Sequence, residues 1–310
     1  MGGPGAVRGV AAEARIAPQA GDDIGVSVAA EARIAPGSLT TQSLAVPGVR
    51  LHYEVRGTSA GGPLLLLLGA PMPAADFAPL AEALASDHTV VTTDPRGIAN
   101  SPLDDPQQDS TPELRADDVA TILDALDAAS ADVFGSSGGA VTGLALVSRH
   151  PKRVRTLIAH EPPVLELLPD AAAQRATTED IIDTFHRDGV AAAMAKFMAN
   201  AGFDVHPEGA PVVSEPSPQQ IAHGTRFLAH ELRGTARYLP DIAALTRGPA
   251  RVVVGIGAAS SGLLTYRTSV ALAERLGTPP VDFPGDHGGF IGQPVEFAKT
   301  LRRVLADTSR

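Results

Sequence analysis

The residues with the clearest chemical potential form a sharp corner between a strand-like segment and a helix-like segment. Residues 131–134 are an apolar run typical of a strand, and residues 140–148 have the pattern of a helix. Between them, Gly135, Ser137 and Gly139 spell Gly-x-Ser-x-Gly, in which small flanking residues allow the turn and hold the serine in a strained, exposed conformation. We interpret Ser137 as a nucleophile. The alternative is an ordinary glycine-rich turn, because this pattern alone often occurs by chance.

A serine nucleophile needs a general base, and that base needs an acceptor that orients it. Of the nine histidines, His287 lies in a glycine-rich loop after the last expected strand, at the sheet edge where Ser137 is also expected. We interpret His287 as the base, against the alternative of a surface histidine. The amide of Gly138 begins the helix after Ser137 and points toward the same space, where it could bind an oxyanion.

Strand-like and helix-like segments alternate over most of the chain. Most of the strands are apolar throughout, which predicts an α/β fold whose mostly parallel sheet is covered by helices on both faces. The expected strands are residues 43–46, 49–55, 64–68, 89–93, 131–134, 154–159, 251–256 and 281–283. The expected helices that alternate with them are residues 77–85, 112–128, 140–148, 263–276 and 294–305.

The same alternation divides the chain into three parts. Residues 1–38 contain a short repeat, in which residues 10–18 return as 28–36, and they are too small and polar to build a core. We expect a disordered, dispensable tail there, or a start codon placed too far upstream. Residues 39–164 and 246–310 form the expected α/β core. Residues 165–245 have a helical pattern and interrupt the core between the sixth and seventh strands.

Composition excludes several classes of function. The 310 residues are 44% hydrophobic and 19% charged, as in a globular protein, and the net charge of −10 disfavours nucleic acid or an anionic membrane as a partner. The longest apolar run is far shorter than the ~20 residues that span a bilayer. There is no cysteine, no metal-ligand spacing, no dinucleotide fingerprint and no phosphate-binding loop. We therefore expect a cytoplasmic protein without cofactor or metal. The sequence leaves open whether the protein forms a homodimer.

Taken together, these motifs resemble the α/β-hydrolase superfamily over about residues 40–307. The resemblance rests on the strand order, the insertion after the sixth strand, and three motifs: Gly-Ser-Ser-Gly-Gly at 135–139, Asp-Pro-Arg-Gly at 94–97 and Gly-Asp-His-Gly-Gly at 285–289. It implies an eight-stranded sheet with a helical cap, a Ser–acid–His triad and no cofactor. Carried over by motif, Ser137 is the nucleophile, His287 is the base, and the oxyanion amides are those of Gly138 and Ala70.

This sequence departs from the family pattern in two places. Leu68 precedes Gly69 where the family usually has histidine, which leaves the oxyanion amide in place. The usual loop for the triad acid, residues 257–262, has no carboxylate. Some members of the family, including lactonases similar to those that open zearalenone, instead carry a glutamate at the end of the sixth strand. Glu161 occupies that position, and we interpret it as the acid, against a surface glutamate before a Pro-Pro turn.

Other acidic residues near these motifs have structural interpretations. We expect Asp286 to be a turn residue. We also expect Asp94 to hold the loop after the fourth strand through Arg96.

The sequence thus predicts a serine hydrolase that cleaves a carboxylic ester or lactone through an acyl-enzyme. Met198, Phe227 and His230 of the insertion are candidates for its substrate pocket, although an ordinary amphipathic helix explains His230 equally well. Two alternatives remain open. One is a cofactor-free perhydrolase, thioesterase or C–C hydrolase of the same fold, and the other is a binding protein without turnover. A haloalkane dehalogenase or epoxide hydrolase is excluded, because its nucleophile would be aspartate.

Overall fold

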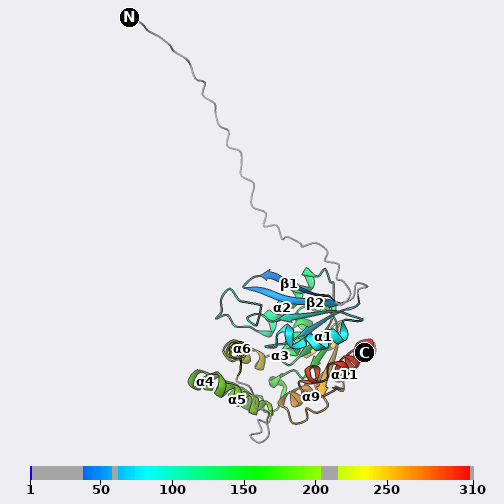
Figure 1. Cartoon of the computed structure of the whole chain (residues 1–310). Coiled ribbons are helices and arrows are strands. Elements are labelled where there is room, and N and C mark those ends of the chain that lie inside the picture. Colours follow the sequence, from blue (N-terminus) through cyan, green and yellow to red (C-terminus); the bar gives the residue numbers. More distant parts are fainter. Residues whose placement is uncertain (2–37, 58–61, 204–215, 308–310) are drawn as a thin grey trace. The chain divides into compact units, whose positions relative to one another are not determined.

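The computed structural model describes residue 1 and residues 38–57, 62–203 and 216–307 (Figure 1). Almost all of the expected N-terminal tail lies outside these described residues, and Ser38 already belongs to the first strand.

The described strands form one eight-stranded sheet in the order β1-β2-β4-β3-β5-β6-β7-β8. β2 runs antiparallel to both of its neighbours, and all pairings from β4 to β8 are parallel. This confirms the predicted fold class. The strands are β1 Ser38–Val46, β2 Val49–Gly57, β3 Leu64–Leu68, β4 Thr89–Asp94, β5 Ala131–Ser136, β6 Val154–His160, β7 Arg251–Gly257 and β8 Val281–Phe283.

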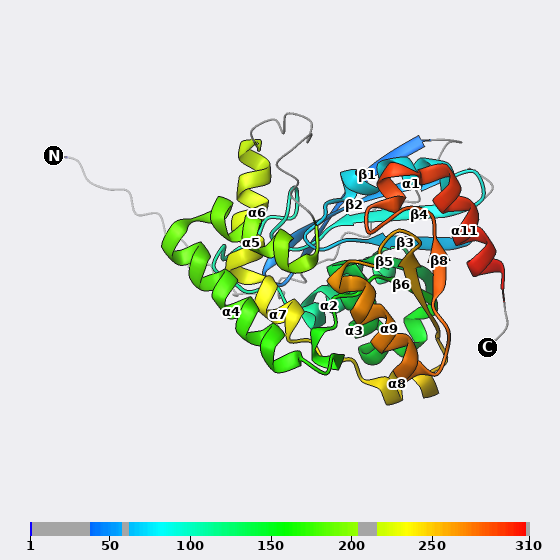
Figure 2. The same cartoon turned by 90° about the horizontal axis from the view of Figure 1, so that it is seen from below.

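Helices cover both faces of the sheet because its central strands bury side chains on both sides. In β3, Leu65 and Leu67 belong to one apolar cluster, and Leu66 and Leu68 belong to the other, as the two-residue period of a strand requires. Figure 2 shows helices α1 and α11 on one side of the sheet and α2, α3 and α9 on the other. Their bounds are α1 Ala78–Leu84, α2 Pro112–Ala125, α3 Gly138–Arg149, α9 Leu264–Leu276 and α11 Pro294–Ala306.

Short helical segments complete the core. They are the 3-10 turns η1 Ala74–Phe77, η2 Pro151–Arg153 and η3 Leu165–Leu167, and the helices α8 Ile242–Arg247 and α10 Gly289–Gly292. α8 packs on the sheet core through Leu245. Among the described helices, none combines the length and apolar character needed to cross a bilayer.

Four helices between β6 and β7 build an apolar cluster of their own, and we call them the inserted helices. They are α4 Ala171–Asp188, α5 Val190–Ala201, α6 Pro218–His230 and α7 Leu232–Ala236. Their contacts with the core involve loops at the carboxyl ends of the strands. His223 Nε2 accepts a hydrogen bond from the Ala99 amide at 3.2 Å, and the Ser110 amide donates to the His230 carbonyl at 3.0 Å. The inserted helices therefore adjoin the sheet edge where Ser137 and His287 lie.

Candidate active site

Ser137 lies at the corner between β5 and α3 with a backbone conformation that is rare outside glycine. Its φ is 55° and its ψ is −125°, and its amide donates to the His160 carbonyl at 3.0 Å. The flanking glycines are required by space. A Cβ on Gly135 would lie 2.5 Å from the Gly139 carbonyl oxygen, and one on Gly139 would lie 2.0 Å from the Leu68 carbonyl oxygen. The corner thus closes only with this small-residue pattern.

Glu161 follows directly after β6, the strand next to the one that carries Ser137. Its φ is 48°, and its amide donates to the Gly255 carbonyl at 3.0 Å, which extends the pairing of β6 with β7 by one residue. The side chain is completely buried. Its Oε1 accepts from the Gly257 amide at 2.8 Å, and its Oε2 accepts from the Thr265 hydroxyl at 2.8 Å. The carboxylate therefore lies beside the loop after β7.

His287 contacts this carboxylate directly. Its Nδ1 lies 2.6 Å from Glu161 Oε2, and 18% of its side chain is exposed. An ionised carboxylate only accepts hydrogen bonds, so Nδ1 carries the proton and Nε2 is left with a free lone pair. Asp286 takes no part in this pair. Its Oδ1 accepts from the Gly288 amide at 2.9 Å within the turn, as expected.

The carboxylate of Glu161 stays ionised despite its burial. Burial alone would raise its pKa, but the hydrogen bond with His287 and the nearby His160 outweigh that effect and lower the pKa to about 2. His160 itself is fully buried among Phe134, Phe283 and Phe297, and burial lowers its pKa to about 4. His160 is therefore neutral at pH 7. Its Nδ1 lies 3.2 Å from the Ser136 hydroxyl.

The two amides predicted to bind an oxyanion, those of Ala70 and Gly138, belong to neighbouring elements. The corner packs directly on the chain after β3, because a Cβ on Gly138 would lie 2.4 Å from the Ala70 carbonyl oxygen. Within the part of the chain that the structure describes, neither the Ala70 amide nor the Gly138 amide has a hydrogen-bond acceptor. Gly138 is also the first residue of α3, where the helix dipole adds partial positive charge.

Ser137 and His287, the predicted nucleophile and base, both contact His160. The rings of His160 and His287 are stacked with centroids 6.3 Å apart, and the His160 carbonyl accepts from the Ser137 amide. Across residues 38–57, 62–203 and 216–307, no hydrogen bond joins Ser137 Oγ to His287.

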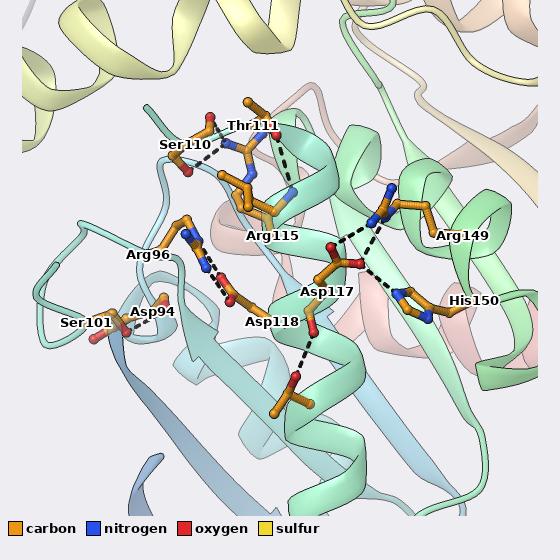
Figure 3. A network of polar contacts seen from close by, with 12 residues as sticks. Asp94, Arg96, Ser101, Ser110, Thr111, Arg115, Asp117, Asp118, Arg149 and His150 are labelled. Carbon is orange, nitrogen blue, oxygen red and sulfur yellow. Dashed lines mark hydrogen bonds and ion pairs between the residues drawn. The ribbon is translucent and has the colours of Figure 1, made fainter. Parts of the chain in front are cut away.

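The loop after β4 is held differently from the expectation (Figure 3). Asp94 is structural, but it does not act through Arg96: its Oδ1 accepts from the Ala74 amide at 2.8 Å, and its Oδ2 accepts from the Asn100 amide at 3.0 Å. Arg96 instead forms two hydrogen bonds with Asp118 on α2, at 2.7 and 2.6 Å. The planar guanidinium matches the two oxygens of a carboxylate reached from a neighbouring helix.

The three predicted pocket residues occupy different environments. Phe227 is buried in the apolar cluster of the inserted helices and packs on Phe197 at 5.1 Å between ring centroids. His230 Nδ1 lies 2.9 Å from Asp109 Oδ1 in the loop after β4. Met198 is half-buried on α5, and its carbonyl accepts from the Phe203 amide at 3.0 Å. No contact in the described residues links these three side chains to Ser137, so their role in a pocket stays a prediction.

Two residues near His287 were not anticipated from the sequence. Phe203, just after α5, lies with its ring centroid 5.8 Å from that of His287, so it is an inserted-segment side chain that contacts the predicted base. Thr265, in the first turn of α9, binds the carboxylate of Glu161. Neither carries a motif. The only sequence feature that could have indicated Thr265 is its position shortly after the loop that lacks the usual acid.

Comparisons with known proteins agree with this architecture. The family model of the α/β hydrolase fold matches residues 62–201. The uncharacterized hydrolase YraK of Bacillus subtilis (strain 168) is 34% identical over 275 residues, which cover 86% of this chain and 97% of that protein. The chain therefore belongs to the α/β-hydrolase family, and it is a hydrolase.

Solved structures show the same fold. The enol-lactonase from Burkholderia xenovorans LB400 matches with a TM-score of 0.57 and 21% identity, over 86% of this chain and 100% of that one. A thermophilic esterase from Thermogutta terrifontis matches with a TM-score of 0.65 and 21% identity, over 86% of this chain and 98% of that one.

Proposed function

We propose that this hydrolase cleaves a carboxylic ester or lactone through an acyl-enzyme, with Ser137 as nucleophile, His287 as base and Glu161 as the orienting acid. The observation that carries the proposal is the 2.6 Å contact between Glu161 Oε2 and His287 Nδ1, together with the hydrogen bond from the Ser137 amide to the carbonyl of His160, the residue before Glu161. The esterase and the lactonase of the same fold support this class of substrate.

The proposed reaction follows from which atoms are free. With Nδ1–H bound to Glu161, Nε2 of His287 accepts the proton of Ser137 Oγ as that oxygen attacks the substrate carbonyl. The amides of Ala70 and Gly138 then bind the oxyanion, and His287 returns the proton to the leaving oxygen. Water attacks the acyl-enzyme with the same base, which releases the acid and restores Ser137.

We further propose that the inserted helices form a cap that binds the substrate. Phe203 supports this role, because it reaches His287 from the end of α5. A Cβ on Gly202 would lie 2.7 Å from the Gly262 carbonyl oxygen, so this part of the insertion packs tightly on the loop after β7.

A fluorophosphonate probe tests the nucleophile without knowledge of the substrate. We expect the wild-type protein to be labelled at Ser137, as read by peptide mass spectrometry, and Ser137→Ala to be unlabelled. A screen of p-nitrophenyl esters and macrolactones with the same two proteins then gives the substrate class. An unlabelled wild-type protein would favour the binding-protein alternative.

A further inference from the structure

The carboxylate of Glu161 is held by donors from three separate elements. The Gly257 amide at the end of β7 binds Oε1 at 2.8 Å. The Thr265 hydroxyl and His287 Nδ1 share Oε2 at 2.8 and 2.6 Å, and the Thr265 hydroxyl lies 3.5 Å from Nδ1. Each of the two oxygens thus has an anchor that belongs to neither β6 nor the loop of His287.

The hydroxyl of Thr265 can play only one part in this arrangement. Oε2 is an acceptor, and Nδ1 of His287 carries its own proton toward that oxygen. The hydroxyl proton of Thr265 is therefore directed at Oε2 rather than at the imidazole. Thr265 is buried with 8% exposure, so a water molecule does not readily take over this bond.

Glutamate needs such an anchor more than aspartate does. Its side chain has one more rotatable bond, so the plane of its carboxylate is less fixed by the backbone. The Gly257 amide alone would hold Oε1 and leave Oε2 free to swing away from His287. With the Thr265 hydroxyl bound to Oε2 as well, both oxygens are held independently of His287.

We infer that Thr265 is a positioning residue that fixes Glu161 for His287 and thereby sets the reactivity of Ser137. The inference rests on the proposed function, since it needs Glu161 to be the acid of the triad. Thr265 does not touch the reacting atoms. Its influence passes through the orientation and the basicity of the carboxylate.

The fluorophosphonate reaction at Ser137 provides the test, because its rate depends on the same base. Thr265→Val keeps the shape and removes the hydroxyl, and we expect labelling to slow by about tenfold, as for the loss of one hydrogen bond to a charged group. Thr265→Ser keeps a hydroxyl and should stay within about threefold of wild type. If the valine variant does not fold by circular dichroism, Thr265→Ala takes its place.

Thr268→Val is the matched control. Thr268 lies one turn further along α9, is fully buried, and donates its hydroxyl to the Pro162 carbonyl at 2.7 Å, beside Glu161 but not to its carboxylate. The same substitution there removes a buried hydroxyl that contacts the chain after β6 and, at 3.0 Å, the Thr265 carbonyl, while the Thr265 hydroxyl stays in place. We expect its labelling rate to remain near that of wild type, which separates support of the chain from support of the carboxylate.

The pH dependence of the labelling rate distinguishes an effect on the carboxylate from a purely structural effect, because a structural effect would leave that dependence unchanged. A carboxylate that loses a donor becomes more basic, so the acidic limb should move up by about half a unit or more in Thr265→Val. Among the described residues, His160 and Asp286 are the other titratable groups around the pair, and both remain in every variant. Thr268→Val should keep the wild-type limb.

The outcomes separate this inference from the proposed function. Thr265→Val with wild-type rate and profile would overturn the role of Thr265, while slow labelling of Glu161→Ala in the same series would leave the triad standing. If Glu161→Ala is labelled at the wild-type rate, or if Ser137→Ala is labelled at all, the proposed function is overturned instead.

Discussion

Glu161 Oε2 lies 2.6 Å from His287 Nδ1, although the two residues are 126 positions apart in the chain. The carboxylate comes from the end of β6, and the imidazole comes from the loop after β8. One strand, β7, lies between β6 and β8 in the sheet, and the glutamate side chain, anchored at the Gly257 amide on β7, reaches His287 across it.

Removal of this acid is the most direct test of the triad. Glu161→Ala should lower kcat by about 10³- to 10⁴-fold, by analogy with loss of the acid in other triads. Glu161→Gln should be nearly as inactive, because an amide favours the wrong tautomer of His287 and does not stabilise the imidazolium. Steady-state ester hydrolysis gives both values. A Glu161→Ala enzyme that keeps a tenth of wild-type turnover, with Ser137→Ala inactive, would exclude this triad.

The low pKa of Glu161 predicts a specific acid sensitivity of the fold. A carboxyl whose pKa falls from 4.5 to about 2 on folding contributes stability that is complete above the unfolded pKa and is lost as pH falls from about 4.5 to about 2. We expect about 3 kcal/mol from this source, and Glu161→Gln should lack that part of the pH dependence. Urea unfolding at several pH values between 2 and 6 measures it. Parallel curves for the two proteins would contradict the linkage.

His160 should make its own contribution at higher pH. Its pKa falls from 6.5 to about 4 on folding, so the unfolded chain binds the extra proton, and stability decreases as pH falls from about 6.5 to about 4. His160→Gln should flatten the pH dependence of the unfolding free energy in that window, whatever its effect at pH 7. The measurement is the slope between pH 4 and 6.5. An unchanged slope would show that His160 is not buried in its neutral form.

Truncation of Phe203 should change substrate preference, whereas truncation of Phe227 should lower stability. Phe203→Ala removes a ring that faces His287, so the ratio of kcat/KM between short and long acyl esters should change by about tenfold. Phe227→Ala opens a cavity in the cluster of the inserted helices and should cost about 3 kcal/mol of stability. Thermal unfolding and an ester chain-length series distinguish the two. Equal effects of Phe203→Ala on every ester would argue against contact with substrate.

Two adjacent aspartates on α2, one buried and one exposed, allow a matched comparison of their ion pairs (Figure 3). Asp118→Ala leaves the buried Arg96 without its partner and should cost about 3 kcal/mol of stability. Asp117, which is 40% exposed in its side chain, pairs with Arg149 and His150, and Asp117→Ala should cost less than about 1 kcal/mol. Denaturant titration of both variants checks the difference. Similar losses would mean that burial of the Arg96 pair has no special weight.

The strands were predictable where local pattern and tertiary role agree. Residues 64–68 read as a strand buried on both faces, and β3 has these bounds. β1 was predicted to begin at residue 43, but it begins at Ser38, because an edge strand pairs on one side only and the polar residues Thr40 to Gln42 do not distinguish it from a loop.

The site divides in the same way. Local motifs predict Ser137 and His287 as site residues. The loop after β7 contains no carboxylate, and this absence favours Glu161 as the acid. The sequence does not predict that Arg96 binds Asp118 or that Thr265 binds Glu161, because each contact joins elements that are distant in the sequence.

The position of Glu161 at the end of β6 has a consequence for how the substrate range of this hydrolase can diversify. In residues 258–262 only Ser260 is buried, and a Cβ on Gly262 would meet no atom within 4 Å. In the proposed triad the carboxylate comes from the end of β6, so this loop carries no catalytic side chain, and it also touches the inserted segment at Gly202. Loop-length libraries between Gly257 and Thr265 can therefore explore new substrates while the acid remains encoded elsewhere, which separates the evolution of specificity from the preservation of chemistry.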